Sequence, residues 1–209
     1  NAFLESVNVP ILNTLWVLGV EADQTLGLTD GYRIVPVHEM PDSRDKEQYL
    51  RHEIGLARLN PKPKVAITAT CRISKVAEEL PKEPDEKGFL DTSHALYEIA
   101  LLLNALDGVA CTPYYSTSYN QPDMPLGMFC CSGGGYQTYD VLGRGSSSKL
   151  SEETANILNQ LLKGFAKLTS YDKKRMGRIL SRLSQAKRRS QIEDKILDLG
   201  IALEMALLD

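Results

Sequence analysis

The densest concentration of one kind of chemistry in this sequence lies between Tyr171 and Arg189. The segment holds eight Lys or Arg residues and one acid, Asp172, so it carries +7 and the rest of the chain carries −10, given a net charge of −3. At about 100° per residue, five of the cations share one side of an expected helix, beside its apolar stripe. These candidate RNA-binding residues are Lys174, Arg175, Arg178, Arg182 and Arg189. Gathered cations of this kind can contact RNA phosphates, although a solvated face of an amphipathic helix is the simpler interpretation.

A second candidate is the acid Glu204, which lies in the apolar segment Ser190–Asp209. Apolar residues recur there at steps of four and three, which predicts a helix, and its second half is apolar on both sides, which predicts burial all round. The stripe consists of Ile192, Ile196, Leu199, Leu203 and Leu207, with Ile201, Met205 and Leu208 opposite. A buried carboxylate must be paired or protonated. We therefore expect Glu204 to bind a structural arginine, such as Arg178 or Arg182, or to orient a catalytic cation supplied from elsewhere.

Other residue types that could do chemistry form weaker patterns. His94 and Glu98 lie one helical turn apart, but no third metal ligand is visible, so a solvated or capping histidine is the simpler interpretation. The stretches SGGGYQ and GRGSSS match neither the P-loop nor the dinucleotide fingerprint, which favours turns. Four cysteines without metal or redox spacing predict reduced thiols. We therefore expect neither a metal nor a cofactor.

The elements that must position these residues change in character once along the chain. Residues 1–145 alternate β-rich runs with helical patterns, whereas residues 149–209 read as helices only, and the Gly/Ser run Leu142–Ser148 separates them. Short connections predict that Leu150–Leu208 forms three antiparallel helices. We expect their core to contain Leu158, Leu161, Ile179, Leu183, Ile196 and Leu203. The expected strands are Thr14–Glu21, Gly31–Glu39, Lys62–Ser74, Val109–Tyr119 and Leu126–Cys131, and the expected helices are Ser43–Asn60 and Asp91–Gly108.

Two local signals concern the ends of the last helix. Ser190, followed three residues later by Glu193, predicts a capping box at its start. No glycine or basic last turn marks its end, which leads us to expect that the fold continues beyond Asp209. No apolar run approaches the roughly 18–20 residues needed to span a membrane, so we expect a cytoplasmic protein that does not insert into membranes.

The segment RRSQIEDKILDLGIALEMALLD, preceded by its basic helix, resembles the opening half of an Apea-like HEPN domain. The residues that fit the family's pattern in order are Ile192, Glu193, Asp194, Ile196, Leu197, Asp198, Leu199, Ile201, Ala202, Leu203, Glu204, Leu207 and Leu208. Residues 15–43 resemble the strands that open the region before such domains. The resemblance implies an α+β chain, in which an N-terminal mixed α/β region precedes the first helices of an all-α HEPN-type bundle.

The resemblance also implies a function. Many HEPN domains are metal-independent RNA endonucleases of phage-defence or toxin systems and act as dimers, with a catalytic Arg and His on a later helix. On this interpretation no catalytic residue lies within the 209 residues, and RNA, a second copy and a phage or host trigger are the expected partners. The alternative is a non-catalytic binding or dimerisation module of the same shape. Arg33 and His38 have the bare spacing of the motif, but Pro36 and the β-branched residues between them predict a strand, so we reject them.

Overall fold

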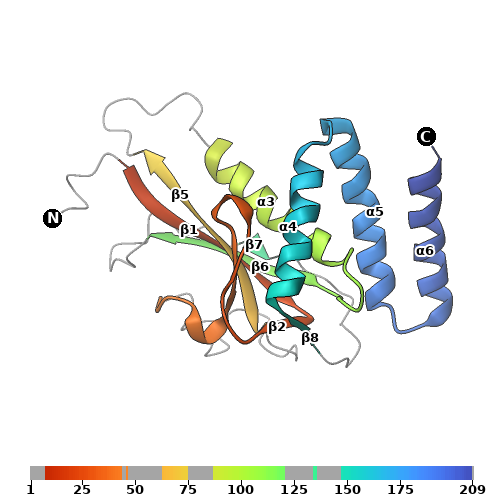
Figure 1. Ribbon diagram of the computed structural model, residues 1–209, viewed down its shortest axis with the longest axis horizontal. Coiled ribbons are helices and arrows are strands. Elements are labelled where there is room, and N and C mark those ends of the chain that lie inside the picture. The colour runs from red at the N-terminus through yellow and green to blue at the C-terminus, as the bar shows by residue number, and fades with distance from the viewer. Residues whose placement is uncertain are drawn as a thin grey trace.

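The computed structural model describes residues 8–43, 46, 63–74, 87–120, 134–135 and 147–208 of the chain. These residues form an antiparallel sheet, a helix packed across it, and further helices beside it (Figure 1). The strands follow the order β3-β4-β5-β1-β6-β7. They are β1 (Asn8–Leu18), β3 (Leu26–Gly27), β4 (Arg33–Pro36), β5 (Val65–Ser74), β6 (Thr112–Asn120) and β7 (Gly134–Gly135). The mixed α+β class expected from the sequence is confirmed, whereas the assignment of the helices to a HEPN-type bundle stays a prediction.

The central strand β1 pairs with β5 on one side and with β6 on the other. Successive side chains of a strand point to opposite faces of a sheet. Leu15 and Val17 accordingly join the main core, and Trp16 joins a smaller cluster with Val35 and Met40. Because both faces of β1 are buried, the strand reads as a nearly continuous apolar run, as expected for a central strand.

Helix α3 (Lys87–Leu103) covers the main face of the sheet and buries Leu96, Ile99 and Leu103 there. It begins at Lys87, before the start expected at Asp91. After Leu103 the chain turns through Gly108, whose φ of 65° favours glycine. Gly108 therefore lies in a turn that follows the helix, and the helix ends before the expected range 91–108 does.

The helices of the C-terminal region are α4 (Glu152–Ala166), α5 (Ser170–Arg188) and α6 (Ile192–Leu207). They run up, down and up beside the sheet (Figure 1), which confirms the three predicted antiparallel helices. Ser151 and Thr154 form a capping box at the start of α4, and the hydroxyl of Thr169 accepts a hydrogen bond from the amide of Asp172 in α5. The capping box predicted at Ser190 is wrong: the N-cap of α6 is Gln191, and no side chain caps it.

The sheet and the first C-terminal helices share one core across the predicted boundary between residues 145 and 149. Strand β8 (Ser148–Leu150) pairs in parallel with β2 (Val20–Ala22). Leu158 and Phe165 of α4 and Leu180 of α5 belong to the same cluster as the sheet residues. The position of α4 and α5 is thus fixed by the sheet, while α6 packs along α5 on the outside (Figure 1).

Strands lie in four of the five expected ranges, and the fifth, 126–131, falls outside the described residues. The expected helix 43–60 also falls outside them, apart from its first residue and Lys46. The turn expected at SGGGYQ includes the short strand β7, whereas GRGSSS reaches the described residues only at its end. None of the described helices combines the length and the apolarity that crossing a bilayer requires.

Candidate docking surface on the last helix

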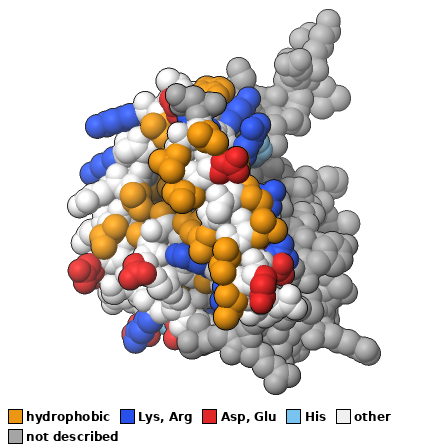
Figure 2. Space-filling model, turned by 90° about the vertical axis from the view of Figure 1, so that its right-hand side faces the viewer, with side chains coloured by type: hydrophobic (Ala, Val, Ile, Leu, Met, Phe, Trp, Pro, Cys, Tyr) orange, Lys and Arg blue, Asp and Glu red, His pale blue; other side chains and the backbone are white. Residues whose placement is uncertain are grey.

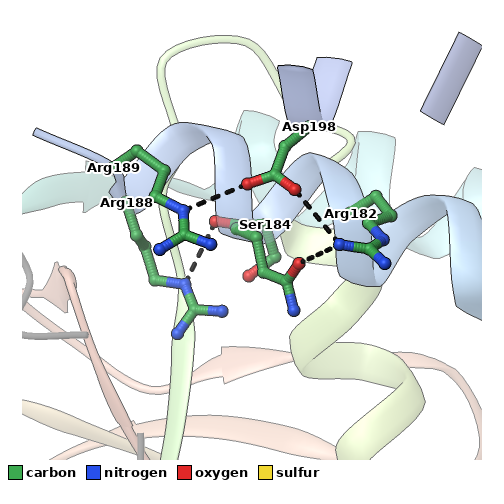
Figure 3. Close-up of polar contacts among 6 residues, drawn as sticks. Arg182, Ser184, Arg188, Arg189 and Asp198 are labelled. Atoms are coloured by element: carbon green, nitrogen blue, oxygen red, sulfur yellow. Dashed lines mark hydrogen bonds and ion pairs between the residues drawn. The ribbon is translucent and has the colours of Figure 1, made fainter. Parts of the chain in front are cut away.

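An ion-pair cluster holds α6 against α5, and its centre is Asp198 (Figure 3). The Asp198 side chain is 5% exposed; its Oδ1 accepts from Arg182 Nη1 at 3.2 Å and its Oδ2 from Arg189 Nε at 3.1 Å. The same Nη1 of Arg182 also donates to Gln185 Oε1 at 3.2 Å. Apart from Asp198, only Ala202 of α6 is fully buried. A buried, doubly paired carboxylate therefore fixes which side of α6 faces the rest of the protein.

Arg175 holds the other end of the same helix. Its guanidinium donates to the carbonyl oxygens of Met205 at 3.0 Å, Ala206 at 3.3 Å and Leu208 at 2.6 Å. The last carbonyl groups of a helix have no intrahelical partner and carry partial negative charge. The sequence of α6 contains no C-terminal capping residue of its own, and Arg175 of the neighbouring helix α5 caps its last carbonyl groups instead.

The prediction that Glu204 is buried is wrong, because its side chain is exposed. Of the two arginines expected to pair with it, Arg182 binds Asp198 instead, and Arg178 is exposed. Ile196 and Leu203, which we expected in the helical core, are 64% and 60% exposed. Helix α6 packs with the side that carries Asp198 facing inward and with its apolar stripe facing outward.

The outward side of α6 is a broad apolar surface, which we call the α6 outer face. Figure 2 shows hydrophobic side chains gathered along this side of the molecule. Seven Leu or Ile side chains of the face are 47–72% exposed: Ile192, Ile196, Leu197, Leu199, Leu203, Leu207 and Leu208. Together they expose several hundred Å² of apolar area, comparable to the largest patch of roughly 300–600 Å² on a typical monomer, and patches of that size are often functional.

Three of the five candidate RNA-binding residues make contacts within the protein, and two do not share those contacts. Arg175, Arg182 and Arg189 make the internal contacts described above, whereas Lys174 and Arg178 are exposed on α5, one helical turn apart. The segregation of positive charge in the sequence is therefore explained in large part by what α5 must hold. Helix α5 faces the C-terminal end of α6 and a buried acid, and a cation stabilises each of them.

A further basic residue, which sequence reasoning did not single out, has a structural role of the same kind. The ammonium group of Lys187 donates to the carbonyl oxygens of Asn104 at 2.7 Å, Leu106 at 2.8 Å and Val109 at 2.9 Å. Burial lowers the pKa of Lys187, and the charge of Asp107 opposes that shift. Lys187 thereby ties α5 to the turn that follows α3. The only feature of the sequence that pointed to this role was the position of Lys187 near the C-terminal end of a basic helix.

Among the residues that the structure describes, no group of three or more His, Cys, Asp and Glu side chains could hold a metal ion. Burial raises the pKa of Glu98, and Lys173 and His94 oppose the shift. Cys71 and Cys111 are free thiols, and burial raises the pKa of Cys111 to about 12, which keeps it protonated and unreactive. Arg33 lies exposed in β4 and His38 in the short 3-10 helix Val37–Glu39, so they belong to different elements.

Asp198 could have been found from its spacing, although sequence reasoning missed it. It lies four residues before the small residue Ala202, on the side of α6 away from the apolar stripe, and the preceding helix is rich in arginine.

Comparison with models of protein families, with curated proteins and with solved structures finds no match to this chain.

Proposed function

We propose that this chain is a binding module that docks another helical element on the α6 outer face. The observation that carries the proposal is the orientation of α6, whose apolar stripe faces outward while a paired carboxylate faces inward. Leaving seven Leu or Ile side chains in water forgoes about 25 cal/mol for each Å² of apolar area that a partner could cover. A helix that is apolar on its outer side and held by ion pairs on its inner side offers a surface on which another helix can pack.

The test separates a docking surface from a core. Ile196→Ser and Leu203→Ser together should leave the melting temperature of the 209-residue chain within a few degrees, because both side chains are already solvated. They should also reduce the binding of a fluorescent apolar dye to the folded chain. The matched control, Leu158→Ser, replaces a fully buried core residue and should lower the melting temperature strongly. If the α6 variant unfolds the protein as the control does, the face belongs to the core and the proposal is wrong.

A second candidate is the ribonuclease implied by the resemblance, with its catalytic Arg and His outside these 209 residues. Two features favour it: Lys174 and Arg178 lie exposed on one side of α5, and Glu204 lies on the face that the later helices of such a domain would cover. Replacing Lys174 and Arg178 by Gln should weaken RNA binding and flatten its salt dependence by about two units in log K against log salt. The 209-residue chain should cleave no RNA. An unchanged salt slope would assign both residues to an ordinary solvated surface.

A further inference from the structure

The α6 outer face is wider than one helix can cover. Leu199 and Leu197 mark its two edges within the helix, and at about 100° per residue the outward arc between them spans about 160°. Both are exposed, and so are the apolar residues between these edges. A helix that packs on one neighbour needs an apolar stripe of only about 100°. The width of the exposed arc therefore calls for two helices side by side.

Two acids lie within this arc, on the Leu197 side of its middle. Glu193 and Glu204 are exposed and lie at nearly the same angle around α6, between the ridge that contains Ile196 and Leu203 and a second ridge that contains Leu197. Gly200 lies between them in the same line, and nothing lies within 4 Å of the Cβ that a side chain there would add. We call Glu193, Gly200 and Glu204 the acidic line. Any partner that covers both ridges also removes the acidic line from water, which is costly unless the partner brings positive charge.

A second copy of this chain fits the face poorly. A two-fold contact sets the same surface patch of each copy against the other. Centred on the α6 outer face, such a contact would bring Glu193 and Glu204 of one copy against the same acids of the other. Like charges placed together across an interface disfavour the complex. The homodimer implied by the resemblance is thus not what the chemistry of this face selects.

We infer that a pair of amphipathic helices from a protein partner binds the α6 outer face. These helices carry Lys or Arg at the positions that lie over the acidic line. This inference rests on the proposed function and specifies the partner. Apolar side chains of the two helices would cover the two ridges, and their cations would pair with Glu193 and Glu204 as these lose water. The notch at Gly200 admits close approach of one partner backbone at the centre of the contact.

The test uses synthetic peptides of the length of α6, 16 residues. One peptide carries a leucine stripe flanked by Lys, and the other carries the same stripe flanked by Gln. By anisotropy titration, the Lys peptide should bind about two per chain, tighter than the Gln peptide. Glu193→Gln with Glu204→Gln should weaken the Lys peptide about tenfold and leave the Gln peptide unchanged. The matched control is Glu152→Gln with Glu153→Gln, on exposed acids of α4, which removes the same charge and should not change the affinity.

Other outcomes overturn the inference in distinguishable ways. If the acidic-line variant and the control weaken the Lys peptide equally, the attraction comes from net charge and the inference is wrong, while the proposed function survives as long as Leu203→Ser still reduces binding. If sedimentation shows a dimer that Leu203→Ser dissociates, a second copy is the occupant. If neither peptide responds to Leu203→Ser, the α6 outer face docks nothing and the proposed function fails as well.

Discussion

The ion-pair cluster around Asp198 gives the sharpest prediction, because its two sides respond differently to mutation. Replacing Asp198 by Ala removes two charge-assisted hydrogen bonds, which are worth about 1.5–3 kcal/mol each in buried sites. The side chains of Arg182 and Arg189 are 43% and 33% exposed, so water solvates them once the acid is gone. Solvent screening at that exposure brings the expected total down to about 2 kcal/mol.

Replacing both arginines by Gln breaks the same two contacts and should cost more. Asp198 is only 5% exposed, so its carboxylate would be left buried without a charged partner, at about 3–5 kcal/mol. Adding Asp198→Ala to the double arginine variant should restore much of the loss, because the stranded charge is removed. The three variants therefore form a cycle whose coupling energy should exceed about 1 kcal/mol.

Native-state hydrogen exchange is the appropriate measurement, because α6 has its main contacts with α5 and can open without global unfolding. Since about 1.4 kcal/mol corresponds to a factor of ten, exchange of the central α6 amides should accelerate about 30-fold in the Asp198→Ala variant and at least about 100-fold in the double arginine variant. Glu204→Gln, which changes an exposed acid in the same helix, is the control and should leave exchange unchanged. If the double arginine variant is no worse than Asp198→Ala, the reasoning from burial is refuted.

Two further predictions concern the core and the turn after α3. Burial raises the pKa of Cys111 from 9.0 to about 12, so the thiol of the unfolded chain loses its proton at a lower pH than that of the folded chain. The free energy of unfolding should therefore be unaffected below about pH 9 and should fall as the pH rises toward 12. By about pH 10.5 the loss should reach about 2 kcal/mol in urea titrations. Cys111→Ala should abolish that part of the alkaline loss, and an identical pH profile would contradict the assignment. Replacing Lys187 by Met removes the donor to three carbonyl groups and should cost about 1–3 kcal/mol, which lowers the melting temperature by about 2–4 °C per kcal/mol. Lys174→Met, at an exposed position of the same helix, should leave the melting temperature unchanged; an equal drop would show that Lys187 stabilises only through its charge.

The positions of the regular elements could largely be predicted from the sequence. The periods of two and of about 3.6 residues identify which side chains share a face, and this property is local to each segment. The β-branched run that became β5 follows from it, as do the alternation of β1 side chains between the two hydrophobic clusters and the three C-terminal helices. Caps were less predictable, because a capping side chain forms its hydrogen bond only when the entering chain has the required direction. Ser151 does so at α4, and the equivalent prediction for Ser190 failed at α6.

Which face of a helix turns inward was decided only by the tertiary structure. The spacing of Ile196 and Leu203 established an apolar stripe on α6 and suggested its burial. The neighbouring helix, however, presents Arg182 and faces an end of α6 that needs Arg175. Asp198 pairs with Arg182, and the small side chain of Ala202 allows α6 to approach α5 closely. The side of α6 that carries Asp198 and Ala202 therefore lies inward, and the apolar stripe lies outward. The local pattern specifies which residues share one face of a helix. Which of its faces packs inward depends on the side chains of the neighbouring helix, and that neighbour is known only once the chain has folded.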